Sequence, residues 1–93
     1  MFKLEKTKIK ESHRSGVSTG RRATSSTCFV KNINEGDSRD VSELSEIKVG
    51  DMVLVSGAYF IKTSPITKIV SSLDNELIFE TGTSEYKLEK DND

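Results

Sequence analysis

Apolar positions in the second half of the chain follow a short, strand-like period. The run Met52-Val53-Leu54-Val55 has the length and β-branching of a buried strand. The pattern predicts four further strands, bounded by turn residues, at 58–62, 66–70, 77–81 and 85–89. Residues 47–90 are therefore the best-defined part of the predicted fold.

The last two predicted strands are expected to form a hairpin around Gly82. Successive side chains of a strand point to opposite faces of the sheet. This alternation predicts that Tyr86 and Leu88 face the core, whereas Lys87 and Glu89 face water.

Signals in the first half of the chain are weaker. Residues 27–33 are rich in β-formers and predict one strand. Asp40 followed by Glu43 resembles a capping box, which predicts a helical turn over 41–46. Residues 1–11 alternate weakly and have two interpretations, a short edge strand or a frayed terminus.

Residues 12–27 contain eight Ser or Thr and two Gly among sixteen residues. Ordering a backbone costs roughly 1–2 kcal/mol per residue, and few apolar side chains here offset that cost. We therefore predict a partly disordered basic arm at 1–27, a small β-barrel domain at 28–90 and a disordered tail at 91–93. The expected fold class is all-β, a small antiparallel barrel or curled sheet, with a Src-homology-3-like barrel preferred.

Charge is divided unevenly along the chain. Residues 1–33 hold eight Lys or Arg and two Glu, whereas residues 34–93 hold six basic and thirteen acidic residues. The resulting charges of +6 and −7 favour an arm that binds an acidic partner or folds onto its own acidic domain. The lone Cys28 and the absence of a long apolar run predict a cytoplasmic protein without a membrane segment.

Candidate catalytic residues are few. His13 is the single histidine and lies in the charged arm, where nothing holds it near a target. Cys28 stands beside Phe29 and Val30, so we interpret it as a small buried hydrophobe. The sequence has no metal-ligand spacing, phosphate loop or dinucleotide fingerprint. We therefore expect a non-enzymatic protein without metal or cofactor.

Several segments between residues 28 and 70 resemble the start of Hedgehog/intein (Hint) domains. They are Cys28-Phe29, Val41-Ser42-Glu43-Leu44, Lys48-Val49-Gly50-Asp51-Met52-Val53-Leu54-Val55 and Ser64-Pro65-Ile66. The resemblance implies an all-β autoprocessing fold in which Cys28 forms a thioester with Thr27. The family's Thr-x-x-His block has no counterpart, because no histidine follows His13.

The function that we expect from the sequence is that of an interaction or regulatory protein that binds an acidic protein partner. Its expected binding residues are Arg14, Arg21 and Arg22 in the arm, and Tyr59, Phe60 and Lys62 on an exposed hairpin. One alternative is an accessory protein that binds nucleic acid through the basic arm. Another is a degenerate Hint-like autoprocessing domain. A small core also favours help from homo-oligomerisation.

Overall fold

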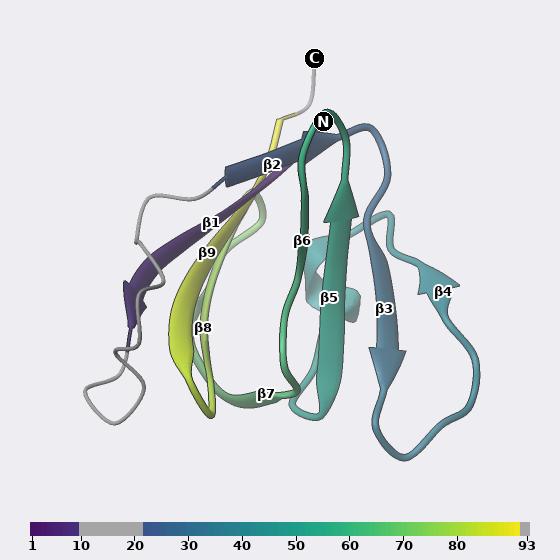
Figure 1. Cartoon of the computed structure of the whole chain (residues 1–93), viewed down its shortest axis with the longest axis vertical. Coiled ribbons are helices and arrows are strands. Elements are labelled where there is room, and N and C mark those ends of the chain that lie inside the picture. The colour runs from purple at the N-terminus through teal and green to yellow at the C-terminus, as the bar shows by residue number, and fades with distance from the viewer. Residues whose placement is uncertain (10–21, 92–93) are drawn as a thin grey trace.

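The computed structural model describes residues 1–9 and 22–91, which form nine strands and one 3₁₀ turn (Figure 1). The elements are β1 (Phe2–Ile9), β2 (Arg22–Ser25), β3 (Phe29–Asn32), β4 (Arg39–Asp40), η2 (Leu44–Glu46), β5 (Asp51–Ser56), β6 (Phe60–Lys62), β7 (Ile66–Ser72), β8 (Glu76–Thr81) and β9 (Ser84–Lys90). Sheet A has the strand order β2-β1-β9-β8-β7, and sheet B has the order β4-β3-β5-β6. All pairings are antiparallel. The all-β prediction is confirmed.

The strand β1 lies inside sheet A, between β2 and β9. Leu4 is opposite Ala23 on one side and Leu88 on the other, and all three side chains are buried. The first residues therefore form a strand, as one of the two interpretations predicted, but an interior strand rather than an edge. Two segments of the range assigned to the arm, β1 and β2, belong to the sheet, and residues 10–21 lie outside the described residues.

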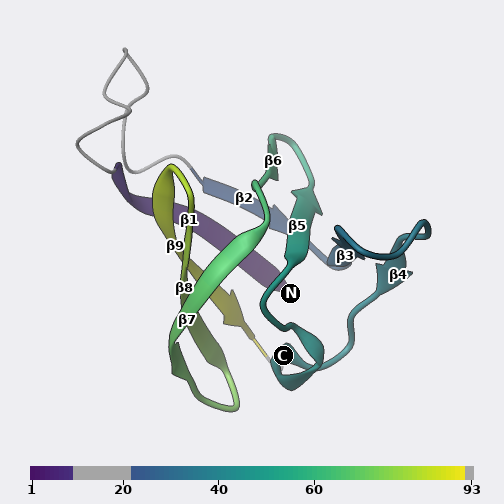
Figure 2. The same cartoon turned by 90° about the horizontal axis from the view of Figure 1, so that it is seen from below.

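The inner faces of both sheets supply one hydrophobic core. Sheet A contributes Phe2, Leu4, Ala23, Ile66, Leu77, Phe79, Tyr86 and Leu88, and sheet B contributes Val30, Val53, Val55 and Ile61. Figure 2 shows β1, β9, β8 and β7 on one side of the molecule and β3, β4 and β5 on the other. Burial of each large apolar side chain contributes about 1.5–3 kcal/mol before the entropy of folding is subtracted.

The two sheets are not joined by a ladder, so the closed Src-homology-3-like barrel that we preferred is not formed. The structure matches the other predicted form, a curled sheet. Closure would need two ladders, because each sheet has two edges, β2 and β7 in sheet A and β4 and β6 in sheet B. The strand β2 packs against β5 and β6 at one of these meeting points, but no ladder joins them. After β6, the hydroxyl of Thr63 accepts a hydrogen bond from the backbone N–H of Val53, 3.0 Å away.

The predicted hairpin around Gly82 is confirmed by the pairing of β8 with β9. Tyr86 and Leu88 are buried, as the alternation predicted. Lys87 and Glu89 lie on the other face and form an ion pair of 3.2 Å. The hydrogen bond and charge of Glu89 raise the pKa of Lys87 above its ordinary value.

The helical turn predicted at 41–46 is shorter and begins later. The 3₁₀ turn covers Leu44–Glu46, and the capping box is formed by Glu43 and Glu46 rather than by Asp40 and Glu43. Asp40 belongs to β4 instead, where it is opposite Phe29. Among the described residues no helix is long and apolar enough to cross a membrane.

A buried carboxylate joins the segments that lead into β5. Asp51 is fully buried and accepts hydrogen bonds from Asn32 Nδ2 at 2.9 Å, Arg39 Nη2 at 3.2 Å and the backbone N–H of Lys48 at 3.0 Å. Buried charges are tolerated when they are paired and hydrogen-bonded in this way. Gly50 precedes it with φ at +94°, a conformation that favours glycine. This network has a structural role, because every group in it is satisfied from within the domain.

Candidate interaction surface

The outer face of sheet B carries apolar and basic side chains side by side. We define this face by six residues: Phe29, Lys31, Met52, Leu54, Phe60 and Lys62. The strand register aligns Phe29 with Leu54 and Leu54 with Lys62, so the three form one row across β3, β5 and β6. Lys31 is opposite Met52 in the adjoining row.

Alternation along the strands explains why these side chains point outward. In β5 the two valines, Val53 and Val55, are fully buried, so Met52 and Leu54 occupy the opposite face and are half-buried. In β6 Ile61 is buried, and Phe60 on the outer side is 56% exposed. The outer face of sheet B thus presents apolar area that no described element covers.

The lysines of this face lack counter-charges among residues 1–9 and 22–91. Neither Lys31 nor Lys62 forms an ion pair with any of these residues. Five other cations of the described chain, namely Lys3, Arg39, Lys48, Lys87 and Lys90, pair with carboxylates at 3.2–3.9 Å. Asp40 lies on β4, opposite Phe29, at the other edge of sheet B from β6. Lys62 on β6 is therefore a cation without an ion-pair partner in the described chain, beside the apolar side chains of β5.

Two hollows meet at Lys62. One, of about 190 Å³, lies on the outer face and is lined chiefly by Phe29, Lys31, Met52, Leu54 and Lys62. The other, of about 170 Å³, lies between β6 and sheet A. Both are small against the roughly 300–1,000 Å³ of ordinary small-molecule pockets. Their size suits single side chains of a macromolecular partner.

The structure brings three of the predicted binding residues together. Tyr59 lies in the turn between β5 and β6 and is 73% exposed, and Phe60 and Lys62 follow it on β6. Arg22 is exposed but lies on β2, in the other sheet. Arg14 and Arg21 lie outside the described residues.

Sequence reasoning missed Phe29, Lys31, Met52 and Leu54 as surface residues. All four positions of 52–55 are apolar, so their pattern alone does not show which side faces outward. The usable signal was Lys31, because a charged residue in a short strand marks the outward side that Phe29 shares. The structure agrees, since Val30 and Asn32 are buried and Lys31 is exposed.

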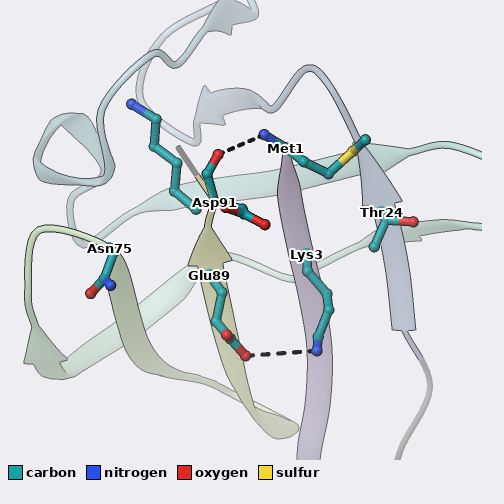
Figure 3. A pocket seen from close by; sticks show the side chains of 7 residues that line it. Met1, Lys3, Thr24, Asn75, Glu89 and Asp91 are labelled. Carbon is teal, nitrogen blue, oxygen red and sulfur yellow. Dashed lines mark hydrogen bonds and ion pairs between the residues drawn. The ribbon is translucent and has the colours of Figure 1, made fainter. Parts of the chain in front are cut away.

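A larger, polar hollow of about 390 Å³ lies where β1, β2 and β9 meet (Figure 3). Charged groups that line it bind other groups of the same domain. The amino group of Met1 donates to the backbone carbonyl of Asp91 at 3.0 Å, and Lys3 pairs with Glu89 at 3.9 Å. We therefore regard this hollow as a seam between chain segments rather than a binding site.

The Cys28 thiol is buried and chemically quiet. Burial, with a smaller contribution from the negative charge of Asp40, raises the pKa of Cys28 to about 12. A thiol must ionise to act as a nucleophile or metal ligand, so this environment opposes both roles. Within the described parts of the chain, no group of His, Cys, Asp and Glu is arranged to hold a metal ion.

Comparison with known proteins adds no family to this geometry. No family model, no curated protein and no solved structure matches the chain at a significant level.

Proposed function

We propose that this protein is a non-enzymatic interaction module that binds an acidic protein partner on the outer face of sheet B. The observation that carries the proposal is the row of apolar side chains flanked by lysines without counter-charges. An extended partner segment complements such a face when acidic and apolar side chains follow each other at every second position, because those positions point to the same side.

The apolar part of the face supplies affinity. Phe60 is more than half exposed, and Phe29, Met52 and Leu54 are half-buried. Covering them removes apolar area from water, which stabilises a complex by about 25 cal/mol per Å² before the cost of association. Aromatic side chains are frequent among the residues that dominate interface energies.

The lysines supply selectivity and speed of association. Exposed charges at the rim of an interface change the association rate and its salt dependence more than the affinity. The predicted arm residues Arg14, Arg21 and Arg22 would add to the same attraction, and they stay a prediction from sequence. Binding to an acidic partner is therefore expected to weaken as salt rises.

Fluorescence polarisation tests this function with two labelled peptides, one that repeats Glu-Glu-Leu-Leu and one that repeats Gln-Gln-Leu-Leu, so that each side of the extended peptide carries both kinds of side chain. The protein should prefer the acidic peptide. Phe60→Ala and Lys31→Glu should each raise the dissociation constant by about fivefold or more. Leu73→Ala and Lys68→Glu are matched controls, because Leu73 is 58% exposed, Lys68 is exposed, and both lie outside this face.

Equal binding of the two peptides, or equal effects of test and control variants, would overturn the proposal. Labelled single-stranded DNA in the same assay tests the nucleic-acid alternative. If DNA binds more tightly than the acidic peptide, and if Phe60→Ala weakens that binding, the partner is a nucleic acid rather than a protein.

A further inference from the structure

Lys6 occupies an unusual place on β1. Side chains alternate along this strand, so Phe2, Leu4 and Lys6 share the face that points inward. Phe2 and Leu4 are buried in the core, and Lys6 is half-buried at the end of the same row. A cation therefore ends a row of core side chains.

Aromatic rings hold this cation in place. Lys6 is opposite Tyr86 in the pairing of β1 with β9, and its Nζ lies 5.8 Å from the centroid of the Tyr86 ring. The Tyr86 ring stacks on Phe79, with centroids 5.5 Å apart. The ammonium group thus lies over one ring of an aromatic pair, and the face of such a ring attracts a cation.

No carboxylate of the described chain neutralises Lys6. Its neighbour Glu5 and the residue before Tyr86, Glu85, alternate to the opposite face of sheet A. Lys6 forms no ion pair within residues 1–9 and 22–91. An anion from outside can therefore approach this ammonium group without competing with a carboxylate of the described chain.

A second unpaired cation faces the same space. The hollow of about 170 Å³ between the sheets is lined by Lys6, Tyr86, Phe60, Ile61 and Lys62. Lys62 has no ion-pair partner in the described chain either. Two lysines and two aromatic residues therefore line a space with room for one side chain.

We propose that this hollow binds one carboxylate side chain of the acidic partner, with Lys6 and Lys62 as its two cations. The inference rests on the proposed function and names the contact that selects acidic partners. Lys62 links the hollow to the outer face of sheet B, because it also lines the hollow there. A partner segment on that face can thus place one acidic side chain over the edge of β6, against Tyr86 and Lys6.

The test compares Lys6→Met with Lys68→Met, using the glutamate–leucine and glutamine–leucine peptides as probes. Methionine keeps the apolar stem over Tyr86 and removes the charge. Lys6→Met should weaken binding of the acidic peptide about fivefold and leave the glutamine peptide unchanged. Lys6→Arg should restore most of the affinity, and Lys68→Met should have no effect. Loss of both peptides alike, or no loss, would overturn the inference.

A second measurement uses the unaltered protein. With ¹³C-labelled lysine, titration of the acidic peptide should shift the Cε resonances of Lys6 and Lys62 but not that of Lys68. Shifts confined to Lys31 and Lys62, with Lys6 unchanged, would refute the carboxylate hollow and leave the proposed function standing. Shifts at Lys6 without any effect of Phe60→Ala or Lys31→Glu would refute the proposed outer face alone. Equal shifts with inorganic phosphate would assign the hollow to anions in general and overturn the carboxylate assignment.

Discussion

The backbone carbonyl oxygen of Thr24 lies where a side chain on Gly57 would begin. A Cβ atom built on Gly57 would stand 1.8 Å from that oxygen. Gly57 lies in the turn between β5 and β6, and Thr24 lies in β2, so this close approach joins the two sheets. The turn that carries Tyr59 is therefore packed directly on the backbone of sheet A.

Replacement of Gly57 by alanine is expected to destabilise the domain by about 2 kcal/mol or more, because the obstructing atom belongs to the backbone and the strands must separate. Gly36→Ala is the matched control, since a Cβ there meets nothing within 4 Å. Urea unfolding of both variants measures the difference. A Gly57→Ala protein as stable as Gly36→Ala would show that β2 and this turn are not in contact in solution.

The burial of Leu4 predicts that the first strand contributes to global stability. Leu4 is fully buried between Ala23 and Leu88, so Leu4→Ala should cost about 2–5 kcal/mol. Leu73→Ala removes the same atoms from a side chain that is 58% exposed, and it should change stability little. Thermal unfolding followed by circular dichroism distinguishes the two. Equal unfolding midpoints for both variants would show that residues 1–9 form an arm outside the folded sheet.

The environment of Cys28 predicts slow thiol chemistry. With its pKa raised to about 12 by burial and by Asp40, the folded protein should react with a disulfide reagent at pH 8 on the order of a hundredfold more slowly than the urea-unfolded chain. Absorbance of the released thiolate measures both rates. Mass spectrometry of the incubated protein should also give one intact chain, whereas cleavage before Cys28 would support the autoprocessing that the Hint resemblance implies.

Acid stability should depend on Glu46. Its carboxylate accepts hydrogen bonds from the backbone N–H groups of Glu43 at 2.7 Å and Ser42 at 3.0 Å, and these bonds lower the pKa of Glu46 below its ordinary 4.5. A lowered folded-state pKa gives stability that is present above 4.5 and lost as the pH falls through the folded value. In Glu46→Gln the free energy of unfolding should therefore fall less steeply than in the unaltered protein as the pH drops below 4.5. The exposed control Asp74→Asn should not change this slope. Urea midpoints at several acidic pH values give the comparison.

Local pattern predicted the elements whose partners are close in sequence. The hairpin of β8 and β9 and the run at Met52–Val55 follow from turn residues and apolar period. The position of β1 could not be predicted this way, because its partner β9 lies at the other end of the chain. The same limit applies to β2, whose Thr and Ser residues indicate a loop until Ala23 is seen opposite Leu4.

Two of the six residues that define the outer face of sheet B, Phe60 and Lys62, were predicted from the sequence, and the other four follow from the fold. Tyr59, Phe60 and Lys62 adjoin a turn signal, so their exposure could be expected. Lys6 and Lys62 line one hollow because the fold brings sheet A beside β6, and no periodicity of the sequence encodes that proximity. Long-range packing, rather than residue type, places Lys6 and Lys62 in the lining of one hollow.

The pairing of β1 with β9, the central strand of sheet A, has a consequence for synthesis of the protein. The register of β1 with β9 joins Phe2 to Lys90, so the five-stranded sheet lacks its middle until residues near 90 are available. In a growing chain on the ribosome, Phe2 and Leu4 therefore stay exposed to water or to a chaperone until β9 has been synthesised. Pulse-labelled nascent chains should accordingly stay sensitive to protease until residues near 90 have left the ribosome.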